Sequence, residues 1–189
     1  MEEISEKKKA ILEATLELVG EYGFHGTPMS LIAKESGVAA GTIYHYFSGK
    51  EELLNELYLY IKQKLIHYVD SKIQDELSYK EKFMRLWIDL HEFYSTHPSI
   101  LFFFEQYVNS PYNKERSPHH FQGKFFHFLQ SGIEAGQLKP VKPEILLAIF
   151  IGSVMASSKI RVFGSISFSD EDLSQAVEML WNTISLGEN

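Results

Sequence analysis

Apolar residues recur every three or four positions along this chain, and no segment alternates apolar and polar residues as a half-buried strand would. The spacing runs through residues 11–22 and again through residues 53–65. It places apolar side chains on one face of a helix, because a helix turns once every 3.6 residues. The sequence therefore predicts an all-α fold.

Helix breakers divide the chain into about nine helical segments. They include Thr27-Pro28, Gly37, Ser48-Gly49, His97-Pro98 and the polar stretch 109–120. The first fifty residues hold three short helices and the later segments are long, which predicts a domain at 1–48 and a helical bundle at 49–189. Ser48 and Glu51 have the spacing of a capping box, so we expect a helix to start at this boundary without a flexible linker.

Composition and charge exclude several classes of protein. The chain has no cysteine, which rules out disulfides, thiolate nucleophiles and cysteine zinc sites. Its first residues, MEEISEKKK, lack the layout of a secretory signal, and the apolar run 145–156 is too short to span a bilayer. We therefore expect a cytoplasmic protein that does not enter a membrane.

The net charge of −7 argues against a general nucleic-acid binder. Residues 1–50 contain five lysines and seven glutamates, a balance of −2. Any contact with DNA must therefore depend on where side chains are placed. Lys7, Lys8 and Lys9 fit a contact with the DNA backbone and a solvated helix start equally well.

Residues 27–47 have the pattern of a helix-turn-helix. Thr27 and Pro28 suit a helix start, with a hydroxyl cap and a proline at the first position. Gly37 permits a tight turn, while Ala33 allows close packing and Ile43 fills the space between the two helices. The second helix is expected at residues 40–47.

A rotation of 100° per residue divides the side chains of this second helix between two faces. Ile43 and Phe47 point inward, whereas Gly41 and His45 point outward with Thr42 and Tyr44 beside them. The outer face thus carries groups that bond phosphates or base edges. The alternative is that the aromatic residues belong to a core, which we accept for Phe47. Tyr46 lies between the faces, and Lys50 sits at a helix N-terminus suited to phosphate.

Residues 9–57 closely resemble the DNA-binding region of TetR-family transcriptional regulators. The resemblance lies in Gly23-Phe24, Thr27, Ile32-Ala33, Gly37-Val38, Gly41-Thr42-Ile43-Tyr44, Tyr46-Phe47 and Lys50-Glu51-Glu52-Leu53. It implies a homodimer, usually a repressor, that a small ligand in the C-terminal helices releases from double-stranded operator DNA. It leaves repression and activation both open.

The resemblance also implies roles for individual residues. Phosphate contacts are expected from Thr27, Tyr44, Tyr46 and Lys50. Base contacts are expected from Thr42 and His45, with Gly41 allowing close approach. Many family members carry a polar residue where this chain has Ala40, so readout there would be an apolar contact, as with a thymine methyl group.

Aromatic residues are concentrated between positions 79 and 135. Most should form a core, but three consecutive phenylalanines at 102–104 cannot share one helix face. The inner faces carry few charges, so a pocket here would take a largely apolar effector. The residues that we expect to line it are Phe83, Trp87, Tyr94, Phe103, Tyr107, Phe125 and Met155.

Two segments near the end suit a dimer interface. Small residues four apart on the first segment would let another helix come close, and the last helix carries a line of apolar residues. These two helices from each of two chains would together form a four-helix interface. The alternative is packing within one chain. The residues are Ala148, Gly152, Ala156, Leu173, Val177, Leu180 and Ile184.

No enzyme motif stands out, and we expect neither catalysis nor a metal or other cofactor. The histidines at 119, 120 and 127, and His91 with Glu92 and His97, lack the HExxH spacing. Two other hypotheses remain: a binding protein for apolar metabolites with a vestigial DNA-binding region, and an α-helical metalloenzyme.

Overall fold

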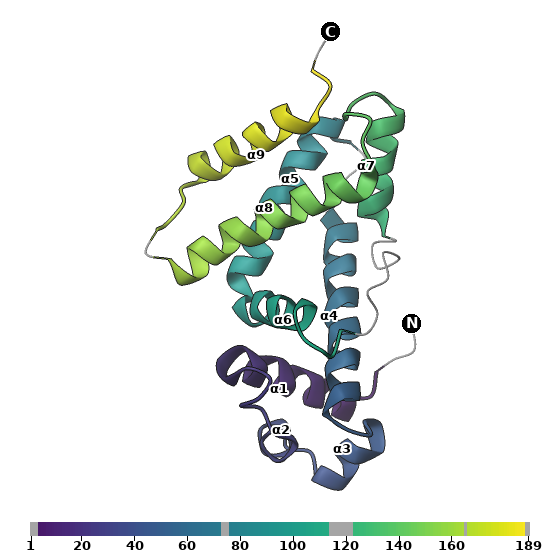
Figure 1. Cartoon of the computed structure of the whole chain (residues 1–189), viewed down its shortest axis with the longest axis vertical. Coiled ribbons are helices and arrows are strands. Elements are labelled where there is room, and N and C mark those ends of the chain that lie inside the picture. The colour runs from purple at the N-terminus through teal and green to yellow at the C-terminus, as the bar shows by residue number, and fades with distance from the viewer. Residues whose placement is uncertain (1–3, 73–75, 114–122, 165, 188–189) are drawn as a thin grey trace. The chain divides into compact units, whose positions relative to one another are not determined.

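A computed structural model describes residues 4–72, 76–113, 123–164 and 166–187 of the chain. Nine helices run through these residues, and no strand occurs among them. The all-α prediction is confirmed (Figure 1). By its contacts the chain divides into two compact units, Met1–Lys64 with His97–Arg116, and Leu65–Thr96 with Ser117–Asn189.

The first unit begins with α1 (Glu6–Tyr22), α2 (Met29–Ser36) and α3 (Ala40–Tyr46). It also contains the first part of α4 (Lys50–Lys72) and the whole of α6 (Pro98–Val108). Helix α1 packs against α2, α3 and α6 (Figure 1). The core of the first unit is made of fully buried aliphatic and aromatic side chains, namely Ile11, Val19, Ile32, Ile43, Phe47, Leu53 and Leu57.

The boundaries of the helices in this unit depend on local hydrogen bonds and glycine conformation. Ser5 caps α1 because its side chain accepts the Lys8 N–H at 3.3 Å. Gly37 ends α2 with a φ of 67°, a left-handed conformation that glycine adopts without a steric penalty.

Two predicted helix starts differ in detail. Helix α2 begins one residue after Pro28, and the Thr27 hydroxyl donates to the Gly23 oxygen at 2.8 Å, so it does not cap the helix. At the start of α4 the Ser48 N–H donates to Glu52 at 2.6 Å. This bond joins Ser48 to Glu52, one position beyond the predicted Glu51, because α4 begins at Lys50.

The second unit contains α5 (Tyr79–Thr96), α7 (Lys124–Glu134), α8 (Pro143–Phe163) and α9 (Asp170–Ile184). Helix α5 packs on α8 and α9, and α7 packs on α8 (Figure 1). An isolated bridge joins Leu138 to Ser185, and the Lys139 N–H donates to the Ile184 oxygen at 2.8 Å. These bonds fix the end of α9 to the loop before α8.

Helix α8 is longer than the apolar run that predicted it. It has 21 residues and is, among the described residues, the one helix long and apolar enough to cross a membrane by those two criteria alone. Its buried flank carries Leu146, Leu147, Phe150 and Val154. One flank of α8 therefore packs within the unit, whereas the opposite side carries exposed apolar residues.

Candidate DNA-binding surface

The turn between α2 and α3 fixes the orientation of α3. Ile32 and Ile43 are almost completely buried, and Val38 in the turn is 9% exposed. These three branched side chains hold one side of α3 against the unit, as the helix-turn-helix pattern predicts. The opposite side of α3 is left to solvent.

The exposed side of α3 carries most of the predicted base-reading residues. Ala40, Gly41 and His45 are exposed, Thr42 is half-buried, and Tyr44 is 55% exposed. Apart from the helix's own backbone and the two chain neighbours, no atom of the described residues lies within 4 Å of the position that a Cβ on Gly41 would take, so the main chain there is accessible. A hydroxyl, a phenol and an imidazole thus surround a stretch of accessible main chain, and all three can donate and accept hydrogen bonds.

Tyr46 is held by a contact that links α3 to the start of α1. Its phenol oxygen accepts a hydrogen bond from Ser5 Oγ at 2.9 Å, and its ring lies 5.6 Å from that of His45 at an angle of 66°. Ser5 was not among the predicted site residues. The feature of the sequence that could have pointed to Ser5 is its position as a helix-capping residue just before the first segment with helical spacing of apolar residues.

Lys50 is bound to the protein itself. Its ammonium donates a hydrogen bond to the main-chain oxygen of Phe24, in the loop between α1 and α2. Partial burial lowers the pKa of this ammonium, because water no longer surrounds the charge fully. Lys50 therefore braces the loop. Lys8 has a partner as well, since its ammonium lies 2.9 Å from the Glu56 carboxylate.

The side chain of Thr27, which was expected at a phosphate, lies inside the first unit. Its side chain is completely buried and its hydroxyl is bonded to the Gly23 oxygen. It cannot reach a phosphate while this loop keeps its conformation. Of the four residues expected at phosphates, Tyr44 alone extends freely into solvent, whereas Tyr46 and Lys50 already have partners within the unit.

The aromatic residues expected around an effector belong to two different units. Phe103 and Tyr107 lie in the first unit, where their rings stack at 5.5 Å and Phe103 meets Phe24 edge-on at 5.8 Å. They extend the core of the DNA-binding unit because α6 packs against α1. Tyr107 also donates to Asn55 Oδ1 at 2.7 Å.

The other expected effector residues lie in the second unit. Phe83 and Phe125 both contact Phe150, with ring centroids 4.9 and 4.6 Å apart. Trp87 donates to Ser153 Oγ at 2.9 Å. Tyr94 is buried, which raises the pKa of its phenol, and Met155 is half-buried. These contacts describe a closely packed aromatic core, which was the alternative interpretation for most of them.

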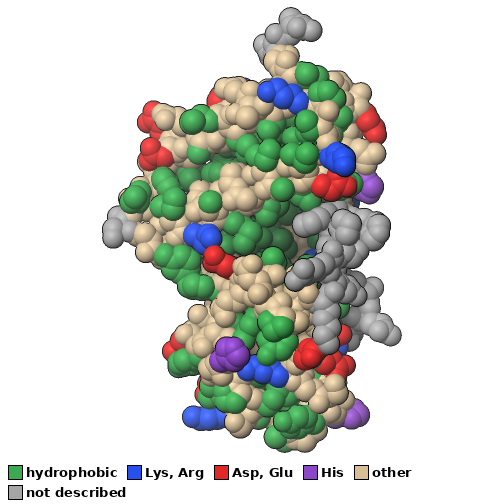
Figure 2. Space-filling view, viewed as in Figure 1, with side chains coloured by type: hydrophobic (Ala, Val, Ile, Leu, Met, Phe, Trp, Pro, Cys, Tyr) green, Lys and Arg blue, Asp and Glu red, His purple; other side chains and the backbone are tan. Residues whose placement is uncertain are grey.

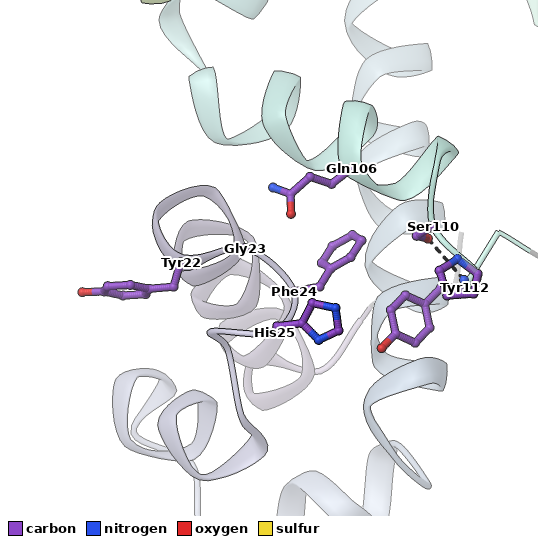
Figure 3. Close-up of a pocket in the computed structure, with 8 residues that line it drawn as sticks. Tyr22, Gly23, Phe24, His25, Gln106, Ser110 and Tyr112 are labelled. Atoms are coloured by element: carbon purple, nitrogen blue, oxygen red, sulfur yellow. Dashed lines mark hydrogen bonds between the residues drawn. The ribbon is translucent and has the colours of Figure 1, made fainter.

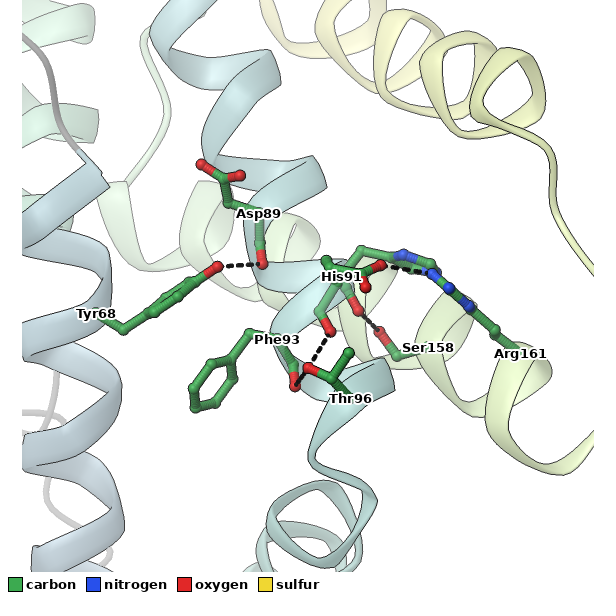
Figure 4. Close-up of polar contacts among 8 residues, drawn as sticks. Tyr68, Asp89, His91, Phe93, Thr96, Ser158 and Arg161 are labelled. Carbon is green, nitrogen blue, oxygen red and sulfur yellow. Dashed lines mark hydrogen bonds and ion pairs between the residues drawn. The ribbon is translucent and has the colours of Figure 1, made fainter.

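Polar groups surround the middle of α5 (Figure 4). The Tyr68 hydroxyl donates to the Asp89 oxygen at 3.0 Å, and Arg161 reaches from α8 to Glu92 at 2.7 Å. His91 is completely buried and stacks on Trp87 at 5.7 Å and 7°. Among the described residues its ring nitrogens make no hydrogen bond of good geometry, and a weak contact with the Ser157 backbone acts to raise the pKa of the ring. Burial, and to a lesser extent the charge of Arg161, lowers the pKa of this imidazole.

The residues expected at a dimer interface fall into two groups. Ala148, Gly152 and Ala156 are exposed on α8. On α9 the picture differs, because Leu173, Val177 and Ile184 are buried where α9 packs on α5 within the same chain, and Leu180 is half-buried. For these three buried residues the alternative of packing within one chain describes what the structure shows.

Among the histidines weighed as metal ligands, those that the structure describes are not grouped. His119 and His120 lie outside the described residues. Within the described ranges, no three histidine, aspartate or glutamate side chains are placed to share a metal ion.

An exposed reading helix after a glycine turn, braced by a three-helix core, defines the class of helix-turn-helix DNA-binding proteins. A family model described as "Bacterial regulatory proteins, tetR family" matches residues 11–57, and one described as "Tetracyclin repressor-like, C-terminal domain" matches residues 78–185. The chain therefore belongs to the TetR family of DNA-binding transcriptional regulators.

Relatives and solved structures agree with this assignment. An HTH-type transcriptional regulator of Haemophilus influenzae is 25% identical over 174 residues, covering 92% of this chain and 93% of the relative. The crystal structure of a TetR-family regulator from Shewanella sp. PV-4 is 28% identical, with a TM-score of 0.84 over 97% of this chain and all of the other. FadR of Bacillus subtilis, solved with stearoyl-CoA, shares the fold, with 21% identity, a TM-score of 0.68 and coverage of 96% and 99%.

Proposed function

We propose that this regulator is a homodimeric repressor that a largely apolar effector releases from operator DNA. The observation that carries the proposal is the exposed face of α3. A bare backbone at Gly41, a free phenol at Tyr44 and an exposed imidazole at His45 suit a DNA groove, and a soluble helix gains no stability from exposing them. On this proposal residues 1–48 form the DNA-reading domain and residues 49–189 serve effector binding and dimerisation.

The exposed side of α8 supports dimerisation. Ile145, Ile149, Ile160 and Phe163 are between 42% and 49% exposed, and they extend the line of Ala148, Gly152 and Ala156 at helical spacing. Hydrophobic side chains gather on this face of the second unit (Figure 2). We assign it to a second copy of the chain, because small residues let two identical helices approach closely about a twofold axis. Two reading helices of such a dimer should lie about 34–36 Å apart, or a multiple of that.

The proposed effector is apolar and carries an acyl chain. The second unit is rich in aromatic side chains, and few charged groups lie among them. FadR of Bacillus subtilis, which shares the fold, was solved with stearoyl-CoA. An effector that binds one arrangement of the helices more tightly shifts the protein toward it, and α4 carries the change to α3 because it runs on from Lys50.

Operator binding is tested by selecting bound fragments from the host genome and measuring their affinities by fluorescence anisotropy. His45→Ala and Tyr44→Ala should each weaken binding about tenfold or more, since a base-edge or phosphate contact contributes about 1–3 kcal/mol. His127→Ala is a matched control on the exposed side of α7. Unchanged affinity in both α3 variants would favour the vestigial interpretation of the DNA-binding region.

Dimerisation is tested by Gly152→Arg. Beyond the backbone of α8 itself and the two chain neighbours, a Cβ at Gly152 meets no atom of the described residues within 4 Å. The substitution should therefore leave the single chain folded while it places a charge on the proposed interface. Gln130→Arg, at an exposed position of α7, is the control. Sedimentation should show a dimer for the control and a monomer for Gly152→Arg. A wild-type chain that stays monomeric at all concentrations refutes this part of the proposal.

Effector release is tested with long-chain acyl-CoA added to the complex of protein and operator. The proposal expects operator affinity to fall as acyl-CoA binds. Tight binding of acyl-CoA without any change in operator affinity would refute release, because coupling requires a different affinity in the two states.

A further inference from the structure

A cavity of about 340 Å³ opens on the first unit, beside the loop that Lys50 braces (Figure 3). One side of it comes from the end of α1 and the loop that follows, and the other comes from the end of α6 and the residues after it. Its main lining side chains are Tyr22, Phe24, His25, Gln106, Ser110 and Tyr112. All of them belong to one compact unit.

The back of the cavity is a fixed aromatic wall. Phe24 is 7% exposed and meets the rings of Phe103 and Tyr112 edge-on, at 5.8 and 5.6 Å. Tyr112 is held in turn because its N–H donates to Ser110 Oγ at 3.2 Å. The wall therefore needs no rearrangement to receive a flat ring.

Gln106 and His25 supply the polar groups of the cavity that remain open to a ligand. The Gln106 amide nitrogen reaches the Val19 oxygen at 3.5 Å, which is the limit for a hydrogen bond, and its oxygen has no partner among the described residues. His25 is exposed and its ring makes no bond in this part of the structure. No aspartate, glutamate, lysine or arginine lines the cavity.

We propose that this cavity binds a neutral heteroaromatic compound that has an N–H beside a C=O, as in a lactam. The carboxamide of Gln106 presents a donor and an acceptor side by side, so it can form two parallel hydrogen bonds with such an edge. The rings of His25 and Tyr112 supply faces for stacking. The volume suits one or two fused rings, and the absence of charged side chains disfavours nucleotides and other anions.

This site is separate from the proposed effector site, and its occupation would act directly on the reading helix. The ligand would bridge α6 and the α1–α2 loop, whose Phe24 oxygen accepts the hydrogen bond of Lys50 at the start of α4. A bound ring would restrict this loop and change operator affinity. By linkage, operator DNA would change the affinity for the ring by the same factor.

The experiment uses quinolin-2(1H)-one as the probe and its N-methyl derivative, which lacks the N–H donor, as the matched control compound. Two-dimensional NMR of the full-length protein follows the signals of His25 and Tyr112 during each titration. The proposal expects the lactam to bind with a Kd below about 1 mM and the N-methyl compound roughly tenfold more weakly.

Two variants locate the binding. Gln106→Leu, which keeps the side-chain volume, should abolish the difference between the compounds, whereas Val108→Ala, at an exposed position of α6, should retain it. His25→Ala should weaken the binding of both compounds by the same factor, because it removes a ring on which they stack and no hydrogen bond within the protein. Equal affinity of the two compounds for the wild type, or shifts confined to the second unit, would overturn the proposal. Operator affinity measured without a probe is independent of this result, so the site and the proposed function fail separately.

Discussion

The Lys50 ammonium donates a hydrogen bond to the main-chain oxygen of Phe24, so the first turn of α4 is tied to the loop that separates α1 from α2. A lysine at this place in a helix-turn-helix protein is expected to contact a phosphate. In this chain its bond stabilises the frame that presents α3.

Lys50→Ala should therefore reduce stability and operator affinity together. Loss of a hydrogen bond from a charged donor costs about 1–2 kcal/mol, and the loosened loop no longer holds α3 in place. Denaturant unfolding and fluorescence anisotropy measure the two effects. Lys34→Ala, an exposed lysine near the end of α2, is the control. If Lys50→Ala lowered affinity at unchanged stability, Lys50 would be a phosphate ligand and not a brace.

Operator binding should depend only moderately on salt. The exposed face of α3 carries no lysine or arginine, Lys8 is paired with Glu56, and Lys50 is bonded to Phe24. Few cations are left to displace counterions from DNA, so the slope of log K against log salt should be shallow compared with that of a heavily basic protein. A titration of labelled operator at several salt concentrations gives the slope, and a steep one would contradict this account.

Three carboxylates at helix starts should make the fold sensitive to acid. Hydrogen bonds from Ser48, Ser78 and Ser169 lower the pKa of Glu52, Glu81 and Asp172 respectively. A carboxyl group with a lowered pKa in the folded state stabilises above its unfolded pKa, near 4, and this contribution disappears as the pH falls through the folded value.

The variant that combines Glu52→Gln, Glu81→Gln and Asp172→Asn should lose less stability between about pH 5 and pH 3 than the wild type. Thermal unfolding across this range measures the difference. The control combines Glu35→Gln, Glu144→Gln and Asp170→Asn, whose carboxylates accept no main-chain N–H in the described structure. A parallel loss of stability in wild type and variant would show that the caps do not contribute.

His91 should destabilise the fold as the pH falls below about 6.5. Its pKa is lowered in the folded state, so the unfolded chain takes up a proton first and gains free energy relative to the folded chain. The buried imidazole would also acquire a charge near Arg161. The loss of stability due to His91 therefore begins at a higher pH than the loss due to the three carboxylates.

His91→Phe should increase stability by about 1 kcal/mol, because it keeps a ring on Trp87 and removes two buried nitrogens that make no hydrogen bond of good geometry among the described residues. It should also abolish the loss between pH 7 and about pH 5. His127→Phe, at an exposed position, is the control. A destabilised His91→Phe variant would mean that the imidazole is hydrogen-bonded in solution.

The sequence predicted the all-α fold and the outward face of α3, because both follow from local periodicity. Gly37 and the inward Ile43 were enough to orient α3, since the turn and the apolar side leave one arrangement. The resemblance of residues 9–57 to one family is confirmed by the match over 11–57.

What the sequence could not give were the long-range partners of polar groups. Thr27, Tyr46 and Lys50 have residue types that suit phosphates, but each is bonded within its unit, to Gly23, Ser5 and Phe24 respectively. The same reason explains why the partner of α9 could not be predicted. Its apolar residues have the same spacing in the sequence whether they pack on α5 or on a second chain. Tertiary packing decides these cases, and periodicity carries no information about it.

The lack of lysine and arginine on α3 has a consequence for how the protein finds its site in a bacterial genome. Chromosomal DNA of every other sequence competes for a DNA-binding regulator mainly through its phosphates. A reading helix with few cations is only weakly retained by those competitors. More of the molecules stay unbound and available, so a small number of copies can keep one target occupied.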